Sequence, residues 1–220
     1  MQAENKNTQH FDNQEISSII KQIRRLIVAS MDGITATNMR QKGLTYQQNF
    51  GVALPRLREI AHTFTPDRTL AEQLWQTTCR ETQIVGLLLM PPDQLTTDTA
   101  LGLADTIQTS ELAEIAAMTL FCRLTDIDQF IVQLPTIANP WRLLTACCTA
   151  TRAHQRLQPH SIETLVHAIA DSDIDMATAN AAYTLLLHLH DHDATTCRPY
   201  IDILAHSPNA LCQRIAALLT

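Results

Sequence analysis

A repeat limits the possible folds of this chain more than any other feature of its sequence. From residue 67 onward, stretches with the apolar spacing of a helix end at intervals of 33, 30, 32 and 35 residues. The last apolar residues of these stretches are Leu74, Ile107, Ile137, Ile169 and Leu204. Each is followed by a few polar residues and a second helical stretch rich in alanine and leucine. Two helices and two short turns per period are typical of an α-solenoid, so the spacing predicts an all-α superhelix of about five to six helix pairs.

Short segments rich in proline, asparagine, serine and aspartate separate these stretches. They lie at 91–93, 125–126, 139–140, 159–161 and 207–209. Such residues form turns and start helices. Only five of the 220 residues are glycine, too few for the turns of a β-barrel or for a glycine-rich nucleotide loop. A helical bundle with evenly spaced elements is the alternative, and five matching units favour the repeat.

The rest of the sequence predicts one domain preceded by a short tail. Residues 1–12 are polar and are expected to be disordered, and residues 13–220 are expected to form a single helical-repeat domain. No stretch reaches the roughly 18 apolar residues of a membrane span. The first fifteen residues also lack the apolar segment of a signal peptide. We therefore expect a cytoplasmic protein that does not contact membranes.

The cysteines fit a reducing compartment. The chain has six of them, at no point in CxxC spacing: Cys79, Cys122, Cys147, Cys148, Cys197 and Cys212. Most lie within apolar helical patterns, where a free cysteine acts as a small buried hydrophobe. The two adjacent cysteines cannot share one helix face, which argues against a joint metal site. No cofactor motif occurs, and no cofactor is expected.

Charge is distributed unevenly along the chain. The net charge of −6 divides into +3 for residues 1–80 and −9 for residues 81–220. Proteins that grip duplex DNA usually carry a basic footprint, because neutralising phosphates supplies most of their sequence-independent affinity. Only the N-terminal third offers such a footprint, as one basic rim of five arginines: Arg24, Arg25, Arg40, Arg56 and Arg58.

Three stretches resemble the HEAT-like-repeat DNA alkylation repair family, the alkylpurine DNA glycosylases. The first is GVALPRLREIA at 51–61, which is similar to an early motif of that family. The second is the apolar helix 70–75 followed by Arg80-Glu81, and the third is the stretch NPWR at 139–142. The resemblance covers about residues 30–220 and implies a HEAT-like or armadillo-like fold.

The resemblance also implies a chemistry. Members of that family hold duplex DNA in a basic concave cleft and cleave the N-glycosidic bond of positively charged alkylated bases. In them an aspartate stabilises the developing sugar cation, aromatic residues contact the DNA backbone, and an arginine secures a phosphate. A carboxylate near an oxocarbenium ion stabilises it electrostatically.

This sequence departs from the family pattern at each of these positions. The aromatic position falls on Ser110 and the catalytic aspartate on Glu114, which keeps a carboxylate one methylene longer. The phosphate-binding arginine falls on Leu143 or Leu144, with Arg142 next to them. The resemblance therefore implies a glycosylase site in which one element is replaced by a similar residue and two are lost.

The concave face of a solenoid is usually lined by the second helix of each repeat, and it binds partners. Glu114 is the candidate catalytic residue; a solvated helix glutamate is the alternative. The candidates for binding nucleic acid or another partner are Arg56, Arg58, Arg80, Glu111, Trp141 and Arg142. For Trp141, packing between repeats is the alternative, and for Arg142 it is a surface charge at a helix start. Trp75 lies in an apolar stripe and is expected in the core.

A histidine-rich segment near the C-terminus offers a possible metal pair. His188 and His192 would lie one turn apart on one helix face, which suits zinc. Histidines at a helix C-terminus also interact favourably with the helix dipole. No third ligand stands at a clear spacing, so no metal site is expected.

Three functions remain open. The first is a divergent or non-catalytic family member that binds DNA, or another partner, on its concave face. The second is an active alkylpurine DNA glycosylase that uses Glu114. The third is a protein-interaction scaffold without nucleic-acid binding, which the net charge of −9 beyond residue 80 favours.

Overall fold

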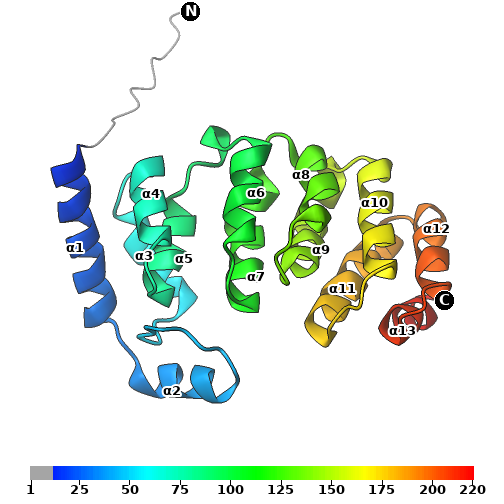
Figure 1. Ribbon diagram of the computed structural model, residues 1–220, viewed down its shortest axis with the longest axis horizontal. Helices are drawn as coiled ribbons and strands as arrows, with labels where there is room; N and C mark the ends of the chain where they lie inside the picture. The colour runs from blue at the N-terminus through cyan, green and yellow to red at the C-terminus, as the bar shows by residue number, and fades with distance from the viewer. Residues whose placement is uncertain (1–11) are drawn as a thin grey trace, which may run out of the picture. The chain divides into compact units, whose positions relative to one another are not determined.

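The computed structural model describes residues 12–220 (Figure 1). Regular structure in this range is helical, which confirms the all-α prediction. The expected tail lies outside the described residues except for Asp12, which caps the first helix. By its contacts the chain forms two compact units, unit 1 up to Pro91 and unit 2 from Pro92 to Thr220. The single domain expected over 13–220 stays a prediction.

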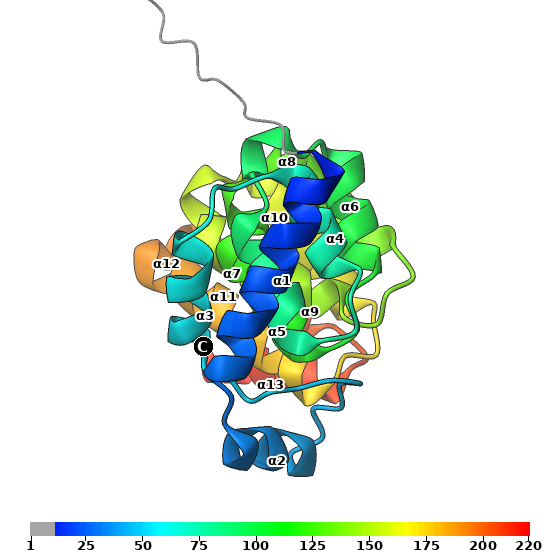
Figure 2. The ribbon, with the colours of Figure 1, turned by 90° about the vertical axis from the view of Figure 1, so that its left-hand side faces the viewer.

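The described part of unit 1, from residue 12 to residue 91, contains five helices. They are α1 (Asn13–Ala29), α2 (Gly33–Gln41), α3 (Leu54–His62), α4 (Arg68–Trp75) and α5 (Arg80–Leu89). A capping box formed by Asp12 and Glu15 starts α1, whose Ile16, Ile23 and Ile27 are fully buried. This apolar stripe packs against α3, α4 and α5. The helix α2 projects beyond the end of α1 (Figures 1 and 2).

The short helix α2 is held through backbone contacts with the loop that leads to α3. The Asp32 amide donates to the Phe50 carbonyl at 2.8 Å. Gly51 has a positive φ of 73°, and a Cβ there would lie 2.1 Å from the Asp32 carbonyl oxygen and 2.6 Å from the Ala36 amide nitrogen. Glycine at this position therefore allows two backbone segments to meet more closely than any side chain permits.

Unit 2 contains four helix pairs. Its helices are α6 (Thr97–Asp105), α7 (Ser110–Thr119), α8 (Ile127–Gln133), α9 (Arg142–Ala153), α10 (Pro159–Ala170), α11 (Met176–His192), α12 (Ala194–Ala205) and α13 (Ala210–Leu218). First helices pack on first helices and second helices on second helices, in the order of the chain. The unit therefore has two layers, α6-α8-α10-α12 and α7-α9-α11-α13. With α4–α5 in unit 1, the described chain contains five such pairs, as the repeat spacing predicts.

Polar side chains tie some repeats of unit 2 to the repeat before them. The Asn139 amide donates to the Asp105 and Ile107 carbonyls at 2.9 and 2.8 Å. In the last repeat, Asn209 donates to the Ser172 carbonyl at 3.2 Å. These links satisfy carbonyls left unpaired where the preceding first helix ends. The same contacts fix the stacking of neighbouring repeats.

Candidate functional site

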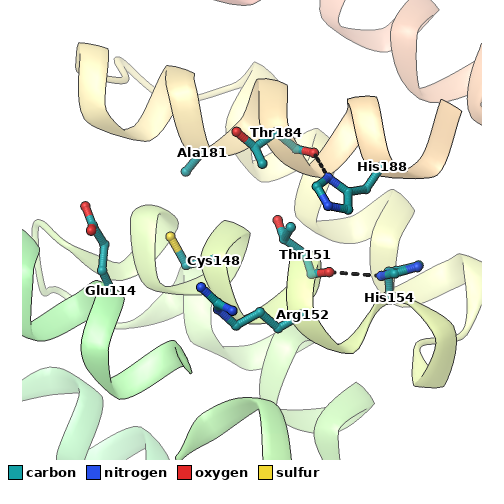
Figure 3. Close-up of a pocket in the computed structure, with 8 residues that line it drawn as sticks. All are labelled: Glu114, Cys148, Thr151, Arg152, His154, Ala181, Thr184 and His188. Carbon is teal, nitrogen blue, oxygen red and sulfur yellow. Dashed lines mark hydrogen bonds between the residues drawn. The ribbon is translucent and has the colours of Figure 1, made fainter. Parts of the chain in front are cut away.

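Unit 2 has a groove of about 530 Å³ on its layer of second helices (Figure 3). Residues of α7, α9 and α11, and of the short 3-10 turn η4 (His154–Arg156) after α9, line it. They are Glu114, Cys148, Thr151, Arg152, His154, Ala181, Thr184 and His188. Second helices thus line this groove; that they form a concave face stays a prediction.

Helix periodicity explains why these side chains share the groove. On α9 the lining residues Cys148, Thr151 and Arg152 stand at positions i, i+3 and i+4, which lie on one helix face. Their neighbours Cys147 and Ala150, on the other side of the helix, are fully buried. The lining residues of α11 likewise recur at i, i+3 and i+7. The groove is thus the polar face of helices whose other faces form the core.

Glu114 is the one carboxylate among the groove residues. Its side chain is exposed, yet neighbouring groups take part of its carboxyl out of water. This partial burial, and secondly the negative charge of Glu111, raise the pKa of Glu114. Loss of a proton from Glu114 is therefore harder than from a free glutamate.

The groove cysteine is not a nucleophile at neutral pH. Burial, and secondly the charge of Glu114, raise the pKa of Cys148 to about 11. Burial also raises the pKa of Cys147, the next residue along α9. Of the six free cysteines, four are buried and two are half-buried, as the sequence predicts.

Three histidines gather at one end of the groove. The His154 ring lies 6.2 Å from the His188 ring and 6.3 Å from the His192 ring, with the rings edge-on. The Nδ1 atoms of His154 and His188 each lie 2.9 Å from a backbone carbonyl of their own helical segment, those of Thr151 and Thr184. Within residues 12–220, no three histidine, cysteine or acidic side chains are placed to hold a metal ion.

Two predicted binding residues lie away from the groove, on the first turn of α9. Trp141 and Arg142 border a separate hollow beside residues 171–178. The Arg142 guanidinium donates to the Pro135 and Asn139 carbonyls at 3.0 and 3.1 Å. These bonds hold the guanidinium against the preceding segment, and a binding role for Arg142 stays a prediction.

The prediction for Arg80 is wrong. Its side chain is buried, with only 4% of the residue exposed, and cannot meet a partner. The guanidinium donates to Glu81 and to the Val52 carbonyl, both at 3.0 Å. Glu81, with no exposed surface, accepts from the Phe50 and Val52 amides at 3.1 and 3.3 Å. The pair holds the loop that contacts α2.

The other three predicted binding residues keep part of their surface exposed. Arg56 and Arg58 are exposed on α3, and Arg56 donates to the Ser30 hydroxyl at 3.0 Å and pairs with Glu59 at 2.8 Å. This places Arg56 beside the C-terminal end of α1. Glu111 is half-buried in the first turn of α7 and is not part of the groove lining.

Arg152 and His154 line the groove but were not predicted as site residues from the sequence. The predicted residues Trp141 and Arg142 lie at the start of α9, whereas the groove crosses the middle and the end of this helix. A signal was present, since Cys148, Thr151 and Arg152 repeat polar or small residues at helical spacing between apolar ones. Reading this spacing on each second helix would have located the groove.

Comparison with known proteins agrees with this architecture. The sequence model of a family described as DNA alkylation repair enzyme matches residues 23–142, more than half of the chain. No curated protein matches the chain in sequence. Among the described residues, no helix combines the length and the apolar character needed to cross a membrane.

A solved structure has a similar fold. It belongs to "a new family of proteins related to the HEAT-like repeat DNA glycosylases with affinity for branched DNA structures". The TM-score is 0.71 at 13% sequence identity, with 90% of this chain and 93% of the other covered. At this identity the likeness shows the fold alone, which is the predicted HEAT-like repeat fold.

Proposed function

Because this chain belongs to the DNA alkylation repair enzyme family, we propose that it binds DNA in the groove between α7, α9 and α11 without excising alkylated bases. The protein of similar fold has affinity for branched DNA structures, and we extend that affinity to this chain. DNA, duplex or branched, is the proposed ligand.

The distribution of charge in unit 2 is the main observation that supports this proposal. Residues 92–220 contain six arginines and fourteen acidic residues, a net charge of −8. Yet the groove is lined by Arg152, His154, His188 and a single carboxylate, Glu114. The acidic residues elsewhere lie mainly on first helices and connecting turns. A groove without the acidity of the unit around it is compatible with phosphates.

The chemistry of the groove argues against excision. A carboxylate that stabilises a sugar cation must be ionised. Partial burial and the charge of Glu111 raise the pKa of Glu114, so its ionised form is less favourable than that of a free glutamate. By the family resemblance, the phosphate-binding arginine falls on Leu143 or Leu144, and both are buried. The aromatic position falls on Ser110, the first residue of α7. The groove therefore keeps a surface for DNA but lacks two of the elements for cleavage.

Fluorescence anisotropy with labelled duplex DNA tests the proposal. Wild-type protein should bind at low salt, with affinity that falls as salt rises from 50 to 200 mM. Arg152→Glu should weaken binding about tenfold, and Arg214→Glu, the same change on exposed α13, should weaken it less than twofold. Absence of binding at low salt would contradict the proposal and favour a protein partner.

Excision through Glu114 is the second candidate, because this residue is the one carboxylate in the groove. It is tested by measuring release of methylated purines from alkylated duplex DNA. We expect no release above that of DNA alone. Release that Glu114→Gln abolishes and Glu111→Gln preserves would establish the enzyme instead.

A further inference from the structure

Unit 1 presents a second surface, at the corner between α1 and α2, which the proposed groove does not use. We name it the α1–α2 corner and define it by the exposed residues Lys21, Arg24, Arg25, Val28, Met31 and Ile34. Cations and large apolar side chains adjoin each other there within fourteen residues of sequence.

The cations of the corner share one face of α1. Lys21, Arg24, Arg25 and Val28 stand at positions i, i+3, i+4 and i+7, so their side chains project in similar directions. All four are exposed, and the core residues of α1 lie on the opposite side of the helix. The bond from Arg56 to Ser30 places a further guanidinium at the C-terminal end of α1.

The apolar side chains of the corner are unusually open to solvent. The exposed fractions are 47% for Val28, 63% for Met31 and 77% for Ile34. Leaving several adjacent large apolar side chains in water is unfavourable, and such patches commonly mark contact sites. Cations beside the patch favour a partner that is both anionic and apolar.

The corner is rigidly held. The Asp32 carboxylate accepts from the Ile34 and Thr35 amides at 2.9 and 3.0 Å, which caps α2 and sets Ile34 in its first turn. The close backbone contact at Gly51 holds the start of α2 against the loop that Glu81 fastens. A partner would therefore meet a fixed arrangement and would not need to order it.

We propose that the α1–α2 corner binds DNA where bases are unpaired or unstacked, as at a branch point. This inference rests on the proposed DNA binding but assigns it a separate surface. Lys21, Arg24 and Arg25 contact phosphates, while Met31 and Ile34 lie against exposed base faces. Apolar side chains at DNA interfaces commonly contact bases in this way, and an intact duplex hides those faces in its stack.

The test compares a three-way DNA junction with a duplex of the same arm sequence by fluorescence anisotropy. Wild-type protein should bind the junction more tightly. The double variant Met31→Ser/Ile34→Ser should lower junction affinity about tenfold, which corresponds to the loss of one base contact. Its duplex affinity should stay within about twofold of the wild-type value. Met176→Ser, at a methionine of unit 2 that is 55% exposed, should change neither affinity. Circular dichroism confirms that each variant is folded.

Replacing the cations of the corner provides an independent test. Lys21→Glu/Arg24→Glu/Arg25→Glu should weaken junction and duplex binding together and reduce the dependence on salt. A 2-aminopurine at the branch point should change fluorescence with wild-type protein and not with the Met31/Ile34 variant.

The outcomes separate the two proposals. Unchanged junction preference in the Met31/Ile34 variant, with duplex still bound, overturns this inference and leaves the groove proposal intact. Absence of binding to both DNAs at low salt overturns both. Binding to phosphatidylcholine vesicles that contain phosphatidylglycerol, lost in that variant while junction binding persists, assigns the corner to lipid and overturns the inference.

Discussion

Unit 1 and unit 2 differ in the kind of internal contact that stabilises each of them. Unit 1 depends on contacts that occur once, chiefly the buried Arg80–Glu81 pair and the close backbone approach at Gly51. Unit 2 instead uses the same kind of contact more than once. A polar side chain of one repeat donates to backbone carbonyls of the previous repeat. A single substitution should therefore do more damage in unit 1 than in unit 2.

The two units also differ in charge. Residues 1–91 contain ten basic and eight acidic residues, a net of +2, whereas residues 92–220 have a net of −8. Most cations in the described part of unit 1 lie on exposed helix faces, whereas in unit 2 one of the six arginines, Arg152, lines the groove. If both contact DNA, they do so by different means.

The largest effect should come from Glu81→Ala in unit 1. The change leaves Arg80 buried without its carboxylate and frees the Phe50 and Val52 amides. Removing one partner of a buried ion pair costs about 3–5 kcal/mol of unfolding free energy. Urea denaturation measures this loss. Glu59→Ala, which breaks the exposed pair with Arg56, should cost less than about 1 kcal/mol.

The second-largest loss of stability should come from Gly51→Ala. It combines a positive φ with a Cβ that would lie 2.1 Å from the Asp32 carbonyl oxygen, so backbone must shift. We expect a loss of about 3 kcal/mol, the upper end for a strained backbone position. Gly43→Ala is the matched control, because its φ is also positive but no atom lies within 4 Å of the added Cβ. If both variants lose equal stability in thermal unfolding, the close approach has no energetic importance.

In unit 2, Asn139→Ala should have a smaller effect. It removes two hydrogen bonds to the Asp105 and Ile107 carbonyls and one from the Trp141 amide. Leaving such buried groups unpaired costs about 2 kcal/mol in chemical denaturation. The control Asn180→Ala, on an exposed position of α11, should cost almost nothing. A cost for Asn139→Ala equal to that for Glu81→Ala would contradict the contrast between units.

The smallest effect concerns pH. Because the pKa of Glu114 is raised, the folded state is more stable when Glu114 is neutral than when it is ionised. The resulting stabilisation is present below the ordinary glutamate pKa and is lost as pH rises through the raised value. Glu114→Gln should therefore match wild type near pH 4 and exceed its stability at pH 7, by less than about 0.5 kcal/mol. Thermal unfolding at both pH values checks this, and a lower stability of the variant at pH 7 would refute it.

The repeat in the sequence predicted the helical layers well. The second helical stretch predicted after Leu74 is α5, in which nine of the ten residues are buried. The helix α2 had no such pattern, with only Ala36 buried. It forms where Asp32 caps it and the loop around Gly51 holds it. Contacts of this kind with distant residues produce no periodic pattern in the sequence.

The site was predicted only in part. Glu114 and His188 were singled out and do line the groove, although His188 had been considered as a metal ligand. Arg80 was expected to be exposed because it starts a helix. Its burial depends on the Val52 carbonyl, 28 residues away in sequence. Distant backbone partners of this kind cannot be read from residue types and local spacing.

The links between repeats in unit 2 have a consequence for how this protein can change in evolution. Asn139 reaches back 34 and 32 residues and Asn209 reaches back 37, so each link joins only adjacent repeats. A helix pair inserted or deleted between two repeats would bring its own link and leave the others unaltered. The length of unit 2 can therefore vary by whole repeats, whereas the part of unit 1 that the buried Arg80–Glu81 pair holds is not interchangeable in this way.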